Sequence, residues 1–285
     1  MTANFLSGLP IAEAILEEIR RQVTQLKARG ITPGLGTILV GEDSASAGYV
    51  RKKHEACTSV GIESFHKEIP ATASQKDLIQ AVIEFNQNPA IDGFLIQNPV
   101  PKGFDFNAAV EAIDPKKDAD GLHPTNLGKL VLQEDGPLPC TPAGIVEILK
   151  YYKIPIQGKE VVIVGRGPTL GRPLSLLLSM KRDWANAAVT VVHTGVKNLT
   201  DYTRRAEILI CAIGVPSFIK PDMVKPGAVV ISGGISWQGK KLMPDVDESV
   251  AEVASWITPR LGGVGPITVA MLLKNTINAA QKSRS

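Results

Sequence analysis

The chain has 285 residues and a net charge of +3; 44% of its residues are hydrophobic, 21% are charged and 5% are aromatic. This length suits one large domain or two modest ones, and so small a charge with so few aromatic rings argues against nucleic-acid binding. The three cysteines are far apart and lack metal-ligand spacing, which fits a reducing cytoplasm and predicts neither a disulfide framework nor a metal site. No apolar run reaches the roughly 18 residues of a membrane helix, and the N-terminal residues lack the pattern of a signal peptide, so we expect a cytoplasmic protein without a membrane segment.

The first half of the sequence alternates between helical and strand patterns. Apolar side chains recur at helical spacing over 11–29, and Gly30 stops the pattern. The predicted elements, in chain order, are a helix over 11–29, a strand over 35–40, a helix from Asp43 or Ser44 to about 60, a helix that opens with a capping box at Ser74–Asp77, and a strand over 93–97. This alternation is typical of parallel βαβ units.

The pattern restarts after a polar, turn-forming segment over 114–142, which is the natural place for a domain boundary. The elements predicted beyond it are a helix over 143–152, strands over 160–165, 189–193, 208–212 and 228–232, and a last helix over 267–282. We therefore predict an α/β protein of two domains, in which residues 1–140 and 267–285 form the first and residues 141–266 form a Rossmann-type second. In this prediction the last helix returns to the first domain.

The loop Gly165–Gly171 lies between a predicted strand and a predicted helix, which is where a dinucleotide-binding fingerprint belongs. Its last glycine falls one place later than in the commonest spacing, and the loop alone indicates nucleotide binding only at about even odds. The end of the next strand has no acidic residue to accept the ribose 2′-hydroxyl of NAD. Arg166, Thr194 and Lys197 are instead suited to a 2′-phosphate, so the sequence favours NADP over NAD.

A second glycine-rich loop, Gly262–Gly265, runs directly into the last helical pattern. Glycines let a backbone approach a ligand closely, and Pro266 suits the first turn of a helix. The start of a helix behind such a loop offers free amides and the positive end of the helix dipole. This loop is therefore predicted to bind an anionic or polar ligand.

Tyr49 and Lys53 lie four residues apart on a predicted helix and therefore share one face. A ring and an amine placed together suit a planar ligand and proton transfer, although an amphipathic surface pair is the more common explanation of this spacing. Short-chain dehydrogenases also carry Tyr-x-x-x-Lys, but there it follows the glycine-rich loop, and here it precedes that loop. Gln97 ends the next strand, where a polar side chain faces the ligand crevice of an open α/β sheet or simply caps the loop.

Acidic residues gather in the segment between the predicted domains. Asp118, Asp120 and His123 are conceivable metal ligands, but their spacing and small number do not favour a metal site. Asp-Gly is a common turn, so turn formation is the simpler interpretation. We therefore expect no bound metal.

Several stretches, in the same order over nearly the whole chain, closely resemble the bifunctional methylenetetrahydrofolate dehydrogenase/methenyltetrahydrofolate cyclohydrolase family. These stretches are Tyr49–Lys53, Asp92–Pro101, Asp118–Asn126, Pro139–Pro142, Gly165–Pro173 and Gly262–Thr268. The resemblance implies a homodimer in which the first domain binds tetrahydrofolate derivatives and the second binds NADP. It also implies oxidation of 5,10-methylenetetrahydrofolate to 5,10-methenyltetrahydrofolate, and hydrolysis of that product to 10-formyltetrahydrofolate.

The resemblance further implies a role for individual residues. Lys53 matches the catalytic lysine of the family, Gln97 its hydrogen-bonding partner and Asp120 the carboxylate that holds the pterin. A lysine whose pKa is lowered by burial is suited to acid–base catalysis, and an amide orients that amine without adding charge. The remaining positions bind ligands: Tyr49, Gly263 and Pro266 bind the substrate, and Gly165, Arg166, Gly167, Gly171, Thr194 and Ile235 bind the cofactor.

Three positions in the second domain depart from the family pattern. Ser232 replaces a common aspartate, Arg260-Leu261 replaces an aliphatic residue followed by proline, and Thr194–Val196 replaces a serine-containing segment. These changes leave the cyclohydrolase residues intact and bear on cofactor choice and dehydrogenase efficiency. Two other interpretations are a shikimate-type dehydrogenase, which has no reason to carry the three polar catalytic residues together, and a binding protein that has lost turnover.

Overall fold

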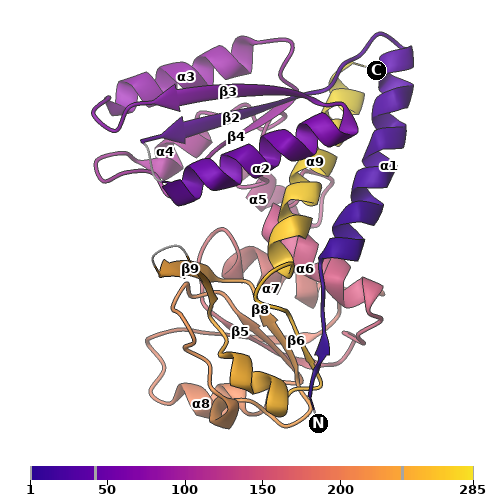
Figure 1. Cartoon of the computed structure of the whole chain (residues 1–285), viewed down its shortest axis with the longest axis vertical. Helices are drawn as coiled ribbons and strands as arrows, with labels where there is room; N and C mark the ends of the chain where they lie inside the picture. Colours follow the sequence, from indigo (N-terminus) through magenta and orange to yellow (C-terminus); the bar gives the residue numbers. More distant parts are fainter. Residues whose placement is uncertain (1, 42–43, 239–240, 285) are drawn as a thin grey trace. The chain divides into compact units, whose positions relative to one another are not determined.

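The computed structural model describes residues 2–41, 44–238 and 241–284, and the chain forms two compact units (Figure 1). We name each unit after the larger sheet that it contains. The three-stranded unit consists of Glu13–Leu138 and Val269–Ser285, and the six-stranded unit consists of Met1–Ala12 and Pro139–Thr268.

The three-stranded unit is built on a parallel sheet in the order β3-β2-β4. Its strands are β2 (Gly34–Val40), β3 (Glu63–Ile69) and β4 (Gly93–Ile96), and its helices are most of α1 (Leu9–Ala28), then α2 (Ser44–Val60), α3 (Gln75–Gln87), α4 (Phe106–Glu111), α5 (Pro124–Leu132) and the later part of α9 (Val264–Ser283). Every residue of the central strand β2 is buried, as expected for a parallel strand covered on both faces. Ile38, Leu78 and Phe94 lie fully buried in one core cluster, which packs α3 onto the sheet.

The six-stranded unit is built on a parallel sheet in the order β1-β11-β8-β7-β5-β6. Its strands are β1 (Asn4–Phe5), β5 (Glu160–Val164), β6 (Ala188–Val192), β7 (Ile208–Cys211), β8 (Val229–Ser232) and β11 (Trp256–Ile257), with a hairpin of β9 (Ile235–Gln238) and β10 (Lys241–Pro244) beside them. Its helices are α6 (Cys140–Tyr151), α7 (Gly171–Ser179), α8 (Leu199–Thr203) and two short 3-10 helices at Pro221–Met223 and Glu248–Glu252. β5 lies between β6 and β7, so the order of the strands reverses there, and open sheets of this kind bind ligands at such a switch point.

Residues 1–12 group with the six-stranded unit and not, as the sequence predicts, with the first domain. β1 pairs in parallel with β11, and the N–H of Gly8 donates to the carbonyl of Gly262 at 2.7 Å. A strand of two residues has no periodicity of its own, so its pairing partner could not be inferred from the local pattern.

Most of the predicted elements are present with small shifts of their ends. The capping box of α3 is formed by Ser74 and Asp77 as predicted, and α9 returns to the three-stranded unit from Val269 onward. Asp43, one of two residues proposed to cap α2, lies outside the described residues, and the helix begins at Ser44. None of the helices in the described part of the chain is long and apolar enough to span a membrane.

Several short elements were not predicted, among them α4, α8, β9, β10 and β11, and two further ones show why. β3 was not predicted, because its side chains are mostly polar and, at the edge of the sheet, mostly exposed or partly buried without a regular alternation. The segment predicted as a loop over 114–142 contains α5, which His123 caps at its N-terminus and Pro124 opens. Because turn-forming residues precede and follow this short helix, its helical periodicity does not stand out in the sequence.

Candidate active site

Lys53 and Gln97 meet in the three-stranded unit. Lys53 is carried by α2 and Gln97 follows β4, and Lys53 Nζ donates a hydrogen bond of 2.9 Å to Gln97 Oε1. Gln97 is 8% exposed, and its Nε2 donates to the carbonyl of Asn98 at 2.8 Å, which fixes the orientation of the amide. The predicted amine and amide are therefore in contact at the carboxyl end of β4.

Two rings flank Lys53 along α2. Burial raises the pKa of Tyr49, so its phenol keeps its proton at neutral pH. Burial, and then the neighbouring His66 and Lys53, lower the pKa of His54, so its imidazole is neutral at neutral pH. Tyr49 lies four residues before Lys53 on the same helix, as predicted, and brings a partly buried ring that carries one hydroxyl group.

Asp120 lies in a turn whose shape Asp118 maintains. The Asp118 carboxylate is 3% exposed and accepts the N–H groups of Gly121 and His123 at 2.9 and 2.8 Å, and Asn126 Nδ2 at 2.9 Å. Asp118 therefore serves the turn, which is the simpler of the two interpretations offered by the sequence.

The residues just before Asp120 run beside β4. The N–H of Phe94 donates to the carbonyl of Lys117 at 2.8 Å, and the N–H of Ala119 donates to the carbonyl of Phe94 at 3.2 Å. This parallel pairing places Asp120 alongside the strand that Gln97 follows. All three predicted catalytic residues thus belong to the three-stranded unit.

His123 also has a structural role. Its Nδ1 accepts the N–H of Thr125 at 3.0 Å and so caps α5. Over residues 2–41, 44–238 and 241–284, no three His, Cys, Asp or Glu side chains come together in a way that would hold a metal ion.

The loop Gly165–Gly171 is packed tightly at the switch point of the six-stranded sheet. Gly165 has φ +121°, and a Cβ there would lie 2.3 Å from the carbonyl oxygen of Ala212, which follows β7. A Cβ on Gly171 would lie 2.2 Å from the carbonyl oxygen of Gly165. A Cβ on Gly167, by contrast, would meet nothing within 4 Å. The loop therefore requires glycine at both ends and presents an open backbone in its middle, which fits a bound dinucleotide.

Arg166 reaches from this loop to the end of β6. Its Nη1 lies 3.1 Å from Nε2 of His193, the residue that follows β6. Thr194 and Lys197 are exposed in the segment that follows β6. The three residues expected at a 2′-phosphate therefore belong to the segments that follow β5 and β6, and the ribose of a dinucleotide lies near strand ends of this kind. His193 was not assigned a role from the sequence, although its position at a strand end in a nucleotide fold was a usable signal.

The second glycine-rich loop also lies in the six-stranded unit. Gly262 has φ +76°, and a Cβ on Gly8 would come within 2.0 Å of the carbonyl oxygen of Gly263, so the two segments pack backbone to backbone. α9 begins at Val264, three residues earlier than predicted, and Pro266 lies in its first turn. Ile235, the remaining candidate, opens β9 in register with Pro244.

Both parts of the chain match models of one protein family. The catalytic domain of tetrahydrofolate dehydrogenase/cyclohydrolase matches residues 6–120, and the NAD(P)-binding domain of the same enzymes matches residues 139–284. The chain belongs to the tetrahydrofolate dehydrogenase/cyclohydrolase family. This membership decides against the shikimate-type dehydrogenase considered from the sequence.

Relatives with this domain pair align along the whole chain. The bifunctional protein FolD of Syntrophotalea carbinolica is 64% identical over 282 residues, which cover 99% of this chain and 97% of the relative. The crystal structure of the bifunctional enzyme FolD from Campylobacter jejuni is 38% identical, with a TM-score of 0.92 and coverage of 98% and 99% of the two chains. The structure of FolD from Trypanosoma brucei, in complex with NADP cofactor and an inhibitor, is 36% identical, with a TM-score of 0.93 and coverage of 100% and 99%.

Two of the positions that depart from the family pattern, Ser232 and Arg260, form hydrogen bonds within the six-stranded unit. Ser232 Oγ donates to the carbonyl of Gly234 at 3.3 Å and accepts the N–H of Asp245 at 3.0 Å. Arg260 donates from Nη1 to the carbonyl of Leu242 at 3.3 Å. The side chain of Leu261 is exposed. Ser232 and Arg260 therefore stabilise the segments around the β9–β10 hairpin.

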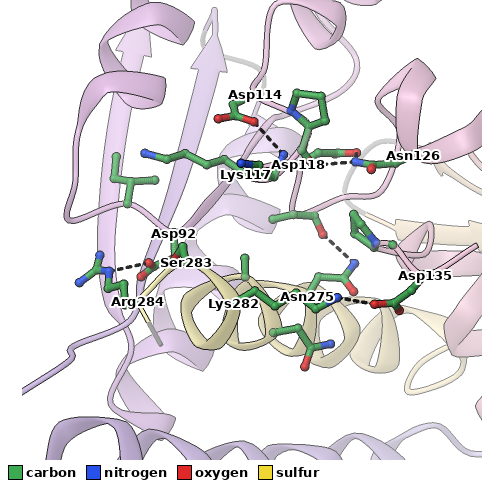
Figure 2. A pocket seen from close by; sticks show the side chains of 18 of the residues that line it. Asp92, Asp114, Lys117, Asp118, Asn126, Asp135, Asn275, Lys282, Ser283 and Arg284 are labelled. Atoms are coloured by element: carbon green, nitrogen blue, oxygen red, sulfur yellow. Dashed lines mark hydrogen bonds and ion pairs between the residues drawn. The ribbon is translucent and has the colours of Figure 1, made fainter. Parts of the chain in front are cut away.

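A cavity of about 880 Å³ lies elsewhere in the three-stranded unit (Figure 2). It lies between α9 and the segment around Asp118, next to the amino end of β4, and Lys53, Gln97 and Asp120 are not among the described residues that line it. Figure 2 shows charged side chains around it that bind one another, such as Arg284 with Asp92. The volume of this cavity therefore does not mark the catalytic site.

Proposed function

We propose that this chain oxidises 5,10-methylenetetrahydrofolate to 5,10-methenyltetrahydrofolate with NADP⁺ and hydrolyses the product to 10-formyltetrahydrofolate. The contact of 2.9 Å between Lys53 Nζ and Gln97 Oε1, in a chain whose two parts match both domains of the family, is the observation that carries the proposal. The chain retains the three predicted catalytic residues Lys53, Gln97 and Asp120, here called the catalytic trio, and this argues against a binding protein without turnover.

The three-stranded unit supplies the acid–base chemistry in this proposal. Lys53 moves a proton at its Nζ, and Gln97 holds that amine in place through a neutral amide oxygen, so the pair carries no opposing negative charge. The Asp120 carboxylate accepts hydrogen bonds from the amine and amide donors along the pterin edge, and such charge-assisted bonds are strong. The partly buried ring of Tyr49 stacks along the folate.

The six-stranded unit binds the cofactor in this proposal. The open backbone at Gly167 receives the pyrophosphate at the start of α7, and Arg166 and Thr194 bind the 2′-phosphate. NADP, when bound, supplies the acceptor for the hydride that leaves the methylene carbon. The protein contributes alignment of the two ligands, and we assign Gly263 and Pro266 to the substrate and Ile235 to the cofactor.

Two further properties complete the proposal. We infer that the chain acts as a homodimer, which follows from the family resemblance. We also infer a cytoplasmic location, which the small, odd number of widely spaced cysteines supports.

The test is an assay with 5,10-methylenetetrahydrofolate in which NADP⁺ and NAD⁺ are compared side by side. Reduced nicotinamide and the methenyl and 10-formyl products are followed together. We expect NADP⁺ to be reduced and 10-formyl product to accumulate. Faster reduction of NAD⁺ would reject the cofactor assignment. If neither cofactor were reduced while added methenyl compound was hydrolysed, the dehydrogenase half of the proposal would be wrong; no turnover at all would leave the binding protein as the function.

A further inference from the structure

Asp245 is a completely buried carboxyl group in the six-stranded unit. It follows β10, its exposed fraction is 0%, and its Oδ2 accepts the N–H of Ile213 at 2.8 Å. Ile213 is the second residue after β7, one of the two strands that flank the switch point of the sheet. The Asp245 backbone N–H donates to Ser232 Oγ at 3.0 Å, which ties the same residue to the end of β8.

The backbone around Asp245 is shaped to admit this carboxyl group. A Cβ on Gly234 would lie 2.0 Å from Asp245 Oδ2, so only glycine fits there. The N–H groups of Gly233 and Gly234 donate to the carbonyl of Cys211 at 2.8 and 3.0 Å, which folds the segment after β8 against the end of β7. Asp245 therefore lies between the segments that follow β7 and β8.

The burial of this carboxyl group is energetically unfavourable. Burial raises the pKa of Asp245, and the N–H groups of Ile213, Gly214 and Val215 oppose that rise only in part. Its Oδ1 is buried and has no hydrogen-bond partner among the described residues. A buried polar atom without a partner destabilises the fold, so its presence calls for an explanation other than stability.

The segment that Asp245 holds adjoins the dinucleotide loop. The carbonyl oxygen of Ala212, the residue directly before Ile213, lies only 2.3 Å from the position that a Cβ on Gly165 would take. The N–H of Ala212 donates to the carbonyl of Val164 at 2.8 Å. Any shift of the segment after β7 therefore moves the backbone against which the start of the glycine-rich loop is packed.

We propose that Asp245 is a positioning residue for the NADP site, which fixes the Ile213–Val215 segment against the glycine-rich loop so that the cofactor is bound in one alignment. The inference rests on the proposed NADP dependence. It adds a residue outside the glycine-rich loop and outside the positions matched to cofactor binding, and it gives Ser232 a function in orienting Asp245. Asp245 acts through the backbone, and no contact with the cofactor is required of it.

The test compares Asp245→Asn with wild type and with the control Asp201→Asn, an exposed carboxylate on α8. Three quantities are measured: the dissociation constant of NADPH from its fluorescence, the rate of hydrolysis of methenyltetrahydrofolate, and the thermal midpoint. Asn keeps the shape but replaces one acceptor oxygen by a donor that faces backbone N–H groups. We expect NADPH to bind at least about tenfold more weakly to Asp245→Asn, which corresponds to about 1.4 kcal/mol. We expect hydrolysis to stay within about twofold of wild type, because the catalytic trio belongs to the other unit, and the control to match wild type.

Each outcome distinguishes the inference from the function on which it rests. Wild-type protein that does not bind NADPH would reject the proposed cofactor and the inference with it. Tight NADPH binding by Asp245→Asn would reject the role of Asp245 and leave the proposed cofactor intact. Equal losses of NADPH binding and of hydrolysis would show that Asp245 only stabilises the fold, which would also reject the positioning role. If Asp245→Asn does not fold, Ser232→Ala decides. It removes the hydroxyl group that accepts the Asp245 N–H and donates to the carbonyl of Gly234, and it keeps the Asp245 carboxyl group. We expect a loss of about two- to fivefold in NADPH affinity, and an unchanged affinity would overturn the proposal.

Discussion

In each parallel sheet, the amino ends and the carboxyl ends of the strands carry charged residues of different kinds. At the amino end of β4, Asp92 is 4% exposed, accepts the N–H of Gly34 at 2.9 Å and pairs with Arg284 at 2.8 Å (Figure 2). The amino ends of β5 and β7 carry the ion pairs Lys159–Glu207 and Arg205–Glu160, each at 2.7 Å. At these amino ends each of the charged groups named is paired with an opposite charge of the same chain, and the pairs stabilise the fold.

At the carboxyl ends two cations have contacts of another kind. Lys53 donates to the amide oxygen of Gln97, and Arg166 lies against a ring nitrogen of His193. Open α/β sheets bind ligands beside the carboxyl ends of their strands, so both cations are placed to act on a ligand. We therefore expect the ion pairs at the amino ends of the strands to serve stability, and these two cations at the carboxyl ends to serve substrate and cofactor. Predictions at each edge test this division.

The largest expected effect is at Lys53. Replacing Lys53 by Met removes the proton-carrying amine while keeping the length of the side chain, so cyclohydrolase activity should fall by about a hundred- to ten-thousandfold. The rate of hydrolysis of methenyltetrahydrofolate measures this loss, and NADP should still bind. The control Lys76→Met removes an exposed amine on α3 and should leave the rate unchanged. Hydrolysis at the wild-type rate by Lys53→Met would remove the proposed role of this residue.

The next effect is on stability, at the opposite edge of the same sheet. Asp92→Ala leaves the N–H of Gly34 and the Arg284 guanidinium without their buried acceptor, which should lower the free energy of unfolding by about 2–4 kcal/mol. Urea unfolding measures the change. Asp135→Ala breaks the exposed ion pair with Lys282 at the same cavity and should change stability by less than about 1 kcal/mol.

The activity of the folded Asp92→Ala protein sharpens the comparison. Because Asp92 lies at the amino end of β4 and Gln97 at its carboxyl end, both reaction rates per folded molecule should remain within about twofold of wild type. If Asp92→Ala were as stable as wild type but catalytically impaired, Asp92 would serve catalysis and not stability, which would contradict the expected division.

In the six-stranded unit, Arg166 tests the carboxyl-end edge. Arg166→Ala removes a cation expected at the 2′-phosphate, and a charge-assisted hydrogen bond is worth about 1.5–3 kcal/mol, so the dissociation constant of NADP should rise by about ten- to a hundredfold. The affinity for NAD, which lacks that phosphate, should change much less. Lys225→Ala removes an exposed cation from the loop before β8 and is the charge control. Equal losses for both cofactors would eliminate the 2′-phosphate assignment.

The sequence predicted the carboxyl-end residues better than the amino-end ones. Lys53 and Gln97 lie in elements that follow adjacent parallel strands, so the topology alone brings them to one edge. The pairing of Asp92 with Arg284 joins residues at opposite ends of the chain, and no local period encodes it. The same holds for Asp245, whose partners lie after β7 and β8 and which the sequence analysis did not single out. The roles given to Tyr49, Asp120 and the glycine-rich loops are still predictions.

The smallest effect is expected at the amino ends of β5 and β7. Lys159, and then the N–H of Glu160, lower the pKa of Glu207. A carboxylate with a lowered pKa in the folded state stabilises the protein above its unfolded pKa of about 4.3, and this contribution is lost as the pH falls through the folded pKa. Because the pair is partly exposed, Glu207→Gln should cost less than about 1 kcal/mol at neutral pH.

Urea unfolding of Glu207→Gln and wild type as a function of pH measures this contribution. The two curves should differ at neutral pH and converge in acid, where Glu207 of the folded wild type is protonated and resembles the variant. High salt should also bring the curves together, because it screens a partly exposed pair. A difference that persisted in acid would show that the packing of Glu207, rather than its charge, holds this edge of the sheet.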